Sequence, residues 1–220
     1  GIGLEALDDG AALRVGDRWL VVTTDSHVVQ PIFFLGGDIG RLSVSGTVND
    51  LAMMGATELL ALTCAVVLED GFPRADLERI VASVRETARE AGAPIVTGDT
   101  KVMGRGEVDG IVMNTTGVGF AARVVTDAGL RAGDRLIVTG TIGDHGIAVM
   151  SVRESLAFET LIESDCAPLH TLVQAIVDAR GHVHVLRDPT RGGLAATLNE
   201  VARRSQVSII VEERRVPVKP

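Results

Sequence analysis

One stretch of the chain is apolar at almost every position: Glu58 to Asp70, with the sequence ELLALTCAVVLED. Continuous apolar runs of this length are typical of strands buried on both faces, whereas half-exposed strands alternate. Residues 38–55 and 73–92 on either side carry apolar residues at helical spacing, and Gly92 is placed to cap the second helix. We therefore expect a layered α/β fold with this strand at its centre, covered on both sides.

The remaining pattern predicts two α/β or α+β domains, residues 1–120 and 121–220, because the alternation of strands and helices restarts after Phe120. In the first domain we expect further strands at 19–25, at 95–96 and at 110–120. In the second domain we expect strands at 134–140, 182–186 and 207–213, and helices that begin near Ile147, Leu169 and Gly193.

Composition excludes several classes of function. The net charge is -8 and the sequence contains no run of basic residues, which argues against a nucleic-acid-binding surface. No apolar run is long enough to span a bilayer, so we expect a soluble protein without a membrane segment. Two cysteines without metal-site spacing indicate a reducing cytoplasm. The chain opens at Gly1 and closes on VPVKP, and we expect it to be a piece of a longer protein.

Acidic residues follow or flank apolar segments throughout the first half: Asp8, Asp9, Asp25, Asp50 and Asp99. Carboxylates that converge at the ends of strands form a hard-oxygen site suited to Mg²⁺. For any one of them taken alone, capping of a turn or helix is the more ordinary explanation. The number of such positions favours the metal site.

Lysine occurs at only two positions, Lys101 and Lys219. We expect residues 95–96 to lead into a Gly98-Asp99-Thr100 turn that Lys101 follows directly. Glycine backbone, a metal ion and a lysine ammonium together form the usual set of groups that bind a nucleoside triphosphate. The sequence contains neither GxxxxGK[ST] nor GxGxxG, so an ATP site here has another design.

Two loops of the second half also carry candidate site residues. Asp144 and His145 lie in GTIGDHG, where a helix N-terminus could bind an anion, His145 could transfer a proton, or the loop could simply cap the helix. In RDPTRGG, Arg191 follows Asp188 and could bind a phosphate or pair locally.

The remaining histidines and cysteines give weaker evidence of a functional site. His182 and His184 alternate on an expected strand, but no third ligand accompanies them. Cys64 is expected in the core, and Cys166 is expected to be more exposed but has no basic neighbour to lower its pKa. We expect neither cysteine to be a nucleophile.

Several motifs together resemble a known family. They are DDGAAL, TTDSHVVQPIFFLGGDIGRLSVSGTVNDLAMMGA, IVTGDTKVMGRGEVDG, GTIGDHG, SDCAPL and RDPTRGGL. These segments are similar to the hydrogenase maturation HypE family, within the PurM-like, aminoimidazole ribonucleotide (AIR) synthase-related, ATP-binding superfamily. The resemblance covers almost the whole chain.

This resemblance implies a PurM-like two-domain fold and a homodimer. The N-terminal sheets of its two copies would form a barrel-like interface that holds Mg²⁺ and ATP, and the C-terminal domain would be an incomplete α/β sandwich. It implies metal ligation by Asp9, Asp25, Asp50 and Asp99. It places Asn49, Gly98, Thr100 and Lys101 at the nucleotide, and it implies that the catalytic residues are Lys101, Asp144, His145, Asp188 and Arg191.

The activity implied by the resemblance is a carbamoyl dehydratase reaction. Such proteins receive a carbamoyl group from the carbamoyltransferase HypF on a C-terminal cysteine, and they use ATP to convert the S-carboxamide into an S-cyanate. The cyanide then passes to a HypC–HypD complex for [NiFe]-hydrogenase. The present sequence lacks the terminal cysteine and a later NEGK-type segment, so we expect these residues alone to bind or hydrolyse nucleotide. An ATP-gated scaffold and a related enzyme such as selenophosphate synthetase are the alternatives.

Overall fold

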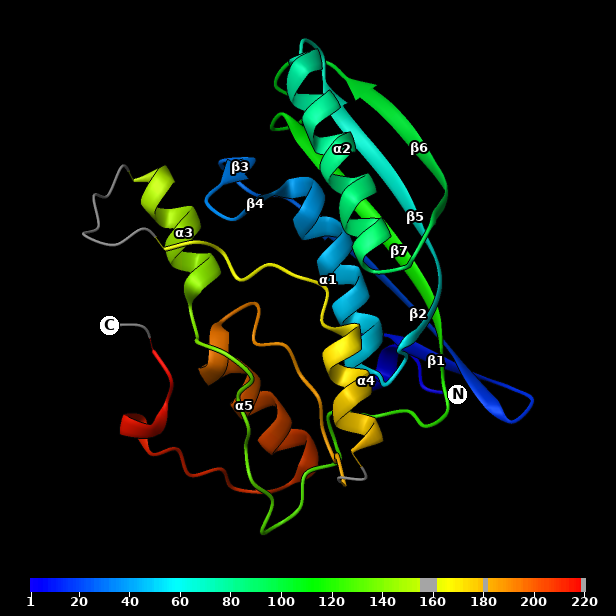
Figure 1. Ribbon diagram of the computed structural model, residues 1–220, viewed down its shortest axis with the longest axis vertical. Coiled ribbons are helices and arrows are strands. Elements are labelled where there is room, and N and C mark those ends of the chain that lie inside the picture. Colours follow the sequence, from blue (N-terminus) through cyan, green and yellow to red (C-terminus); the bar gives the residue numbers. More distant parts are fainter. Residues whose placement is uncertain (155–161, 180–181, 219–220) are drawn as a thin grey trace.

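The computed structural model describes residues 1–154, 162–179 and 182–218 (Figure 1). A five-stranded sheet in the order β1-β2-β7-β5-β6 forms the first part of the chain. Its strands are β1 (Ala11–Val15), β2 (Arg18–His27), β5 (Glu58–Glu69), β6 (Ile95–Met103) and β7 (Ile111–Ala121). Only the β5–β6 pairing is parallel. The sheet is therefore mixed and open, with β1 and β6 at its edges.

Helices α1 (Ile39–Met53) and α2 (Arg74–Glu90) cover one face of this sheet. Strand β7 shows the resulting alternation, with every second residue from Ile111 to Ala121 buried beneath the helices. A Cβ atom at Gly117 would lie 2.8 Å from side-chain atoms of both Leu51 and Thr47, so a larger residue there would force these α1 side chains to shift. The helices at 38–55 and 73–92 are confirmed.

The opposite face of the sheet has no covering layer within the described residues. Leu60 of β5 exposes 41% of its surface, and the neighbouring strands present polar side chains, with Thr24 and Thr116 hydroxyls 3.0 Å apart. The prediction that residues 58–70 are covered on both faces is therefore wrong for this chain, because both helices pack on the same side. The strand is nevertheless an interior strand of the sheet, since β7 and β6 flank it, although the middle strand is β7.

A small hairpin precedes α1, formed by β3 (Phe33–Phe34) and β4 (Gly37–Asp38). Asp38 caps α1 by accepting a hydrogen bond from Arg41 N at 2.9 Å. Val44, Val48 and Leu51 of α1 are fully buried, and Ala52 and Met53 pack against Val173 of α4, so the helix is enclosed between the sheet and the second part of the chain.

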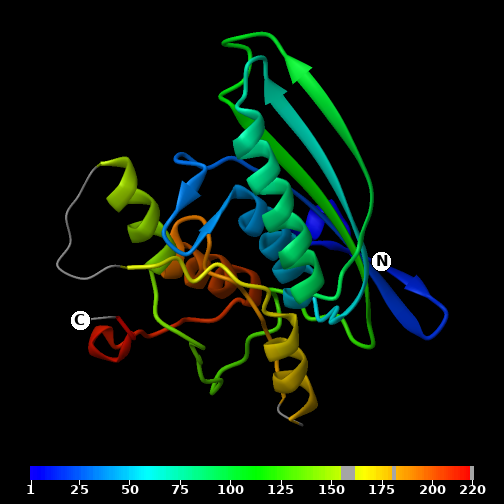
Figure 2. The same cartoon turned by 45° about the horizontal axis from the view of Figure 1, so that its top comes forward.

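The second part wraps around the free side of α1, as Figure 2 shows from a second angle. It contributes α3 (Asp144–Arg153), α4 (His170–Asp178) and α5 (Gly193–Ser205), and α4 packs directly on α1. Two short 3-10 helices, Leu4–Ala6 and Glu213–Arg215, complete the described elements. The predicted helices near Ile147, Leu169 and Gly193 are confirmed.

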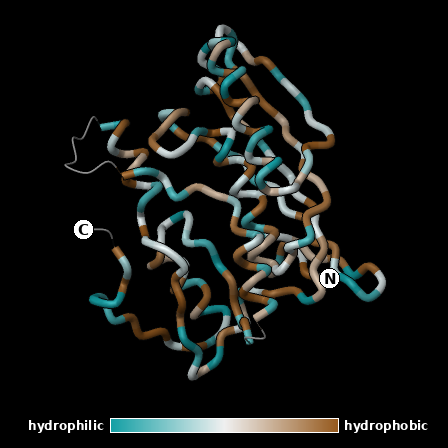
Figure 3. Tube along the Cα trace, in the orientation of Figure 1, coloured by the Kyte–Doolittle hydropathy of each residue, from teal (hydrophilic) through white to brown (hydrophobic). Residues whose placement is uncertain are grey.

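The three strands predicted at 134–140, 182–186 and 207–213 are wrong: no strand forms in the described part of residues 122–218. These segments keep their apolar sequence, but none pairs with a neighbouring segment through a ladder of backbone hydrogen bonds, which a strand needs. Ile137 is 86% and Ile210 is 91% exposed, and hydrophobic colour continues along this part of the trace (Figure 3).

A third correction concerns residues 95–101. The predicted short strand and turn are one continuous strand, β6, which runs through Gly98 and Lys101 to Met103. None of the helices within the described ranges has both the length and the apolar character needed to cross a bilayer.

Candidate functional site

Three carboxylates from distant parts of the sequence meet beside α1. Asp9 precedes β1, Asp50 lies on α1, and Asp188 lies in the loop before α5. One carboxylate oxygen from each lies within 4.8 Å of the others. The backbone brings them together because α1 is enclosed between the sheet and the second part of the chain. We call these three residues the carboxylate cluster.

Burial and mutual repulsion perturb the carboxylate cluster. Burial raises the pKa of Asp9 to about 7, and the positive charge of Arg187 opposes this rise. Burial, followed by repulsion from Asp188 and Asp9, raises the pKa of Asp50 to about 8. The pKa of Asp188 is also raised, mainly by burial. Burial and repulsion destabilise the ionised forms of these carboxyl groups. A hard divalent cation bound between them would stabilise all three as carboxylates.

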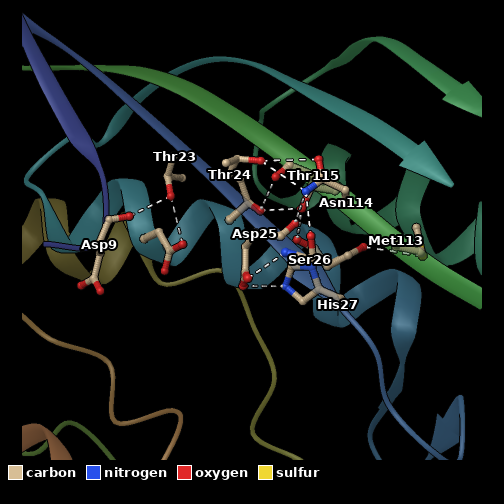
Figure 4. Close-up of polar contacts among 12 residues, drawn as sticks. Asp9, Thr23, Thr24, Asp25, Ser26, His27, Met113, Asn114 and Thr115 are labelled. Atoms are coloured by element: carbon tan, nitrogen blue, oxygen red, sulfur yellow. Dashed lines mark hydrogen bonds and ion pairs between the residues drawn. The ribbon is translucent and has the colours of Figure 1, made fainter. Parts of the chain in front are cut away.

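Asp25 adjoins the cluster on β2. Its pKa is lowered, chiefly because His27 donates to it, with Nε2 3.2 Å from Oδ2. The backbone N–H of Ser26 also donates to Asp25, at 2.8 Å. Arg191 lies near enough for its charge to lower the same pKa. Asp25 therefore supplies a stable negative charge next to the cluster, and Figure 4 shows it held against His27.

The cluster is fixed to β2 by the hydroxyl of Thr23. Thr23 Oγ1 lies 2.7 Å from the backbone oxygen of Asp9 and 3.1 Å from Asp50 Oδ2, and its one proton can serve either (Figure 4). Thr23 itself is buried. This contact sets the spacing of Asp9 and Asp50 before any ligand arrives.

A second set of charges links the two parts of the chain next to the cluster. Arg187 forms an ion pair with Asp9 and lies 2.9 Å from Asp127. Arg204 of α5 reaches Asp127 at 3.2 Å and Asp8 at 3.3 Å. Sequence reasoning missed this network, although the adjacency of Arg187 to Asp188 was a usable signal. The network holds Asp9 in place across the junction between the two parts.

The residues predicted to bind phosphate on β6 lie away from this cluster. Pairing places Gly98 opposite Cys64, Cys64 opposite Thr115, and Thr115 opposite Asp25, so three strand spacings separate Gly98 from Asp25. A Cβ atom at Gly98 would lie 1.9 Å from the carbonyl oxygen of Cys64, so this glycine serves the close pairing of β5 and β6.

The side chains that follow Gly98 are exposed on the same edge strand. Asp99, Thr100 and Lys101 are all exposed, and Asp99 accepts a hydrogen bond from the backbone of Thr100 at 2.9 Å. A single copy of the chain therefore does not bring Asp99 or Lys101 to the carboxylate cluster.

Asn49 is adjacent to Asp50 but uses its amide elsewhere. Its Nδ2 donates to the backbone oxygen of Ala167 at 3.1 Å, and its Oδ1 accepts from Leu169 N at 2.8 Å. Both ends of the side chain thus hold the segment before α4 against α1. This structural role differs from the predicted contact with a nucleotide.

Asp144 and His145 lie at the start of α3 and are not members of the carboxylate cluster. Gly143 has φ 92° at the N-cap, and Thr141 Oγ1 donates to Asp144 Oδ2 at 2.5 Å. His145 packs edge-on against Phe34 of the hairpin, with ring centroids 5.2 Å apart. The start of α3 is thus linked to the β3–β4 hairpin through His145.

Of the remaining candidates, Cys64 packs against the core as predicted. The strand predicted to carry His182 and His184 does not form, and His184 Nδ1 lies 2.8 Å from Asp134. Cys166, expected to be more exposed, is partly buried, and burial raises the pKa of its thiol to about 11. A thiol with such a pKa is a poor nucleophile at neutral pH.

Comparison with known proteins identifies the class to which this fold and site belong. The family model described as AIR synthase related protein, N-terminal domain, matches residues 7–121, and that of the corresponding C-terminal domain matches residues 131–220. Thiamine monophosphate kinase from Aquifex aeolicus shares the fold at 19% identity, with a TM-score of 0.67.

Relatives with higher sequence identity identify the family within this class. Carbamoyl dehydratase HypE of Cupriavidus necator is 54% identical over 211 residues, which cover 95% of this chain and 60% of the relative. The Escherichia coli protein of the same name is 46% identical, over 97% of this chain and 63% of the relative. The chain belongs to the HypE family of AIR synthase related proteins.

Solved HypE structures agree with this assignment. HypE in a HypE–HypF complex has a TM-score of 0.92 at 48% identity, covering 98% of this chain and 70% of that one. HypE in complex with ATP has a TM-score of 0.89 at the same identity, covering 98% of this chain and 64% of that one. The chain spans 60% to 65% of the length of the first three curated relatives.

Proposed function

We propose that the carboxylate cluster of Asp9, Asp50 and Asp188 binds Mg²⁺ and with it the phosphates of ATP. The observation that carries this proposal is the convergence of three oxygen donors whose pKa values are raised by burial and by one another. A bound Mg²⁺ would supply positive charge to phosphate oxygens. Asp25, held by His27, adds a fourth carboxylate, and the similar HypE structure in complex with ATP supports the choice of nucleotide.

We propose further that the site is completed by a second copy of the chain. Lys101 and Asp99 lie on an edge strand, and all residues of β6 after Ile95 are exposed. The open face of the sheet is likewise uncovered within the described residues. A homodimer in which β6 of one copy approaches the cluster of the other would place the Lys101 ammonium at the phosphates, which one copy cannot do.

Mixing two inactive variants tests this shared site. Asp50→Asn removes a cluster ligand, and Lys101→Ala removes the ammonium. Random pairing of the two variants yields mixed dimers with one intact site, so about a quarter of all sites should recover ATP turnover. If both groups act within one copy, mixing restores nothing.

We propose that the whole protein is an ATP-dependent carbamoyl dehydratase acting in the cytoplasm. The carbamoyl oxygen of an S-carboxamide attacks the γ-phosphorus of ATP, the bond to ADP breaks, and the oxygen becomes part of a phosphate leaving group. Loss of that phosphate and of both N–H protons leaves an S-cyanate. The protein's contribution is to position the two substrates and to stabilise charge, with Arg191 and Lys101 as the cationic groups.

One partner in this proposal has support from a relative. A structure of a HypE–HypF complex supports HypF as a partner, and in this proposal HypF donates the carbamoyl group and a HypC–HypD complex receives the cyanide. Mass spectrometry of the full-length carbamoylated protein tests the reaction: addition of ATP should remove the mass of one water. ATP hydrolysis without this loss would instead indicate an ATP-gated scaffold.

A further inference from the structure

Ser164 lies in a segment that the proposed function does not use. Its backbone N–H donates to Leu35 O at 2.8 Å, and its atoms press on Gly36, where a Cβ would lie 2.8 Å from both Ser164 N and O. Its hydroxyl accepts a hydrogen bond from Cys166 N at 3.1 Å. Ser164 is therefore fixed in both backbone and side chain.

The same hydroxyl contacts the imidazole of His145. Ser164 Oγ lies 3.0 Å from His145 Nδ1. The other side of the ring is bounded by Phe34, at an interplanar angle of 80°. The ring is thus held by one polar and one aromatic contact, both from outside its own helix.

The direction of the hydrogen bond follows from the donors and acceptors present. A serine hydroxyl has one proton, and an imidazole nitrogen either donates or accepts. Among the contacts of Ser164 Oγ in the described residues, Cys166 N is a donor, and only His145 Nδ1 can accept. If Nδ1 carried the proton, the hydroxyl proton would have no acceptor among these contacts.

We propose that Ser164 is a positioning residue that donates to His145 Nδ1 and thereby fixes the imidazole with its proton on Nε2. His145 then offers Nε2–H as a hydrogen-bond donor to an oxygen of the ligand, such as a phosphate or carbamoyl oxygen. Burial lowers the pKa of His145 below its ordinary value, and the charge of Asp165 opposes this only in part, so the ring is neutral near pH 7. The role toward a ligand rests on the proposed function, whereas the tautomer does not.

Nitrogen-15 NMR of the imidazole tests the tautomer directly, because protonated and unprotonated ring nitrogens have well-separated shifts. The chain has five histidines, and the signals lost in His145→Gln assign the relevant pair. We expect Nδ1 of the wild-type protein to be unprotonated and Nε2 protonated. A wild-type ring protonated on Nδ1 would overturn the proposal without any variant at Ser164.

Variants then test the part played by the hydroxyl. Ser164→Ala should give a mixture of tautomers, and Ser164→Thr should restore the wild-type shifts. Ser151→Ala is the matched control, since Ser151 lies on α3 and donates only to Ala148 O, at 2.8 Å, among its described contacts. Unchanged His145 shifts in a folded Ser164→Ala would refute the role of Ser164.

Kinetics of the full-length protein separate this inference from the proposed function. Ser164→Ala should lower kcat by about tenfold or more with little change in KM for ATP, as for loss of a positioned proton donor, while Ser151→Ala changes neither. If wild-type protein shows no ATP-dependent dehydration, the proposed function fails and the NMR result still decides the tautomer. Full kcat in a folded Ser164→Ala would overturn its positioning role.

Discussion

Replacing Asp50 by asparagine should stabilise the metal-free protein at alkaline pH. The substitution keeps the shape of the side chain and an oxygen that can accept from Thr23 Oγ1. It removes the negative charge that burial, Asp188 and Asp9 make costly. A buried carboxylate without a neighbouring positive charge lowers the free energy of unfolding, so a neutral replacement should raise it.

The size and sign of the effect follow from the pKa. A carboxyl whose pKa rises from 3.8 to about 8 on folding costs at most about 6 kcal/mol when fully ionised. Because repulsion is shared with Asp9 and Asp188, we expect Asp50→Asn to recover about 1–3 kcal/mol. The native state binds more protons than the unfolded chain between these two pKa values. The stability of the wild-type protein should therefore fall as pH rises, and the gain should grow toward pH 8 and above.

Urea denaturation in EDTA at about pH 5 and at about pH 8.5 measures this difference. The exposed turn residue Asp17 provides the control, Asp17→Asn, which should change stability little at either pH. Mg²⁺ should raise the unfolding free energy of the wild-type protein and leave Asp50→Asn unaffected. A less stable Asp50→Asn at alkaline pH, or one that Mg²⁺ still stabilises fully, would refute the reasoning.

Three further predictions concern packing and reactivity. Leu51→Ala should lower the unfolding free energy by about 2–5 kcal/mol, because this side chain is fully buried, while Leu60→Ala, on the open face, should cost less than about 1 kcal/mol; equal losses in urea denaturation would contradict the assignment of the covered face. Gly98→Ala should cost about 3 kcal/mol or more by forcing a Cβ against the carbonyl oxygen of Cys64, and hydrogen exchange should show loss of protection in β6; a variant as stable as the wild type would exclude this close pairing. Alkylation of Cys166 at about pH 8 should be at least about a hundredfold slower than that of a free thiol and should accelerate toward pH 11, because the raised pKa leaves little thiolate; a rate like that of a free thiol would show that the site is open.

Helices and strands with a regular apolar pattern were predictable from the sequence. α1 buries Val44, Val48, Leu51 and Ala52, and every second residue of β7 is buried, whereas Val81 on the predicted apolar stripe of α2 is 57% exposed. The structure of the apolar segment at 207–213 was not predictable in this way. An apolar pattern shows that a segment can pair or pack, but it does not show whether a neighbouring strand is present. The same limit explains why β5 is covered on one face only.

The candidate site was predictable in its residue types and only partly in its arrangement. Asp9 and Asp50, both predicted as metal ligands, converge, and the third member of the cluster is Asp188, which was predicted as a catalytic residue instead. Asp99 does not join them within one chain, because the order of strands in the sheet is a property of the fold that spacing along the sequence does not contain. Asn49 shows a second limit. It is adjacent in sequence to Asp50, a member of the carboxylate cluster, but its side chain donates to Ala167 O instead.

Isothermal titration of ATP, with Mg²⁺ and with EDTA, tests the central claim most directly. The titration compares the wild-type protein, Asp188→Asn and the control Asp17→Asn. We expect the wild type and Asp17→Asn to bind ATP only when Mg²⁺ is present. We expect Asp188→Asn to bind ATP at least about tenfold more weakly, because even mutation of a residue that only orients a metal ligand typically lowers metal affinity by this much. Equal affinity in EDTA, or wild-type affinity in Asp188→Asn, would contradict a magnesium–nucleotide site at the carboxylate cluster.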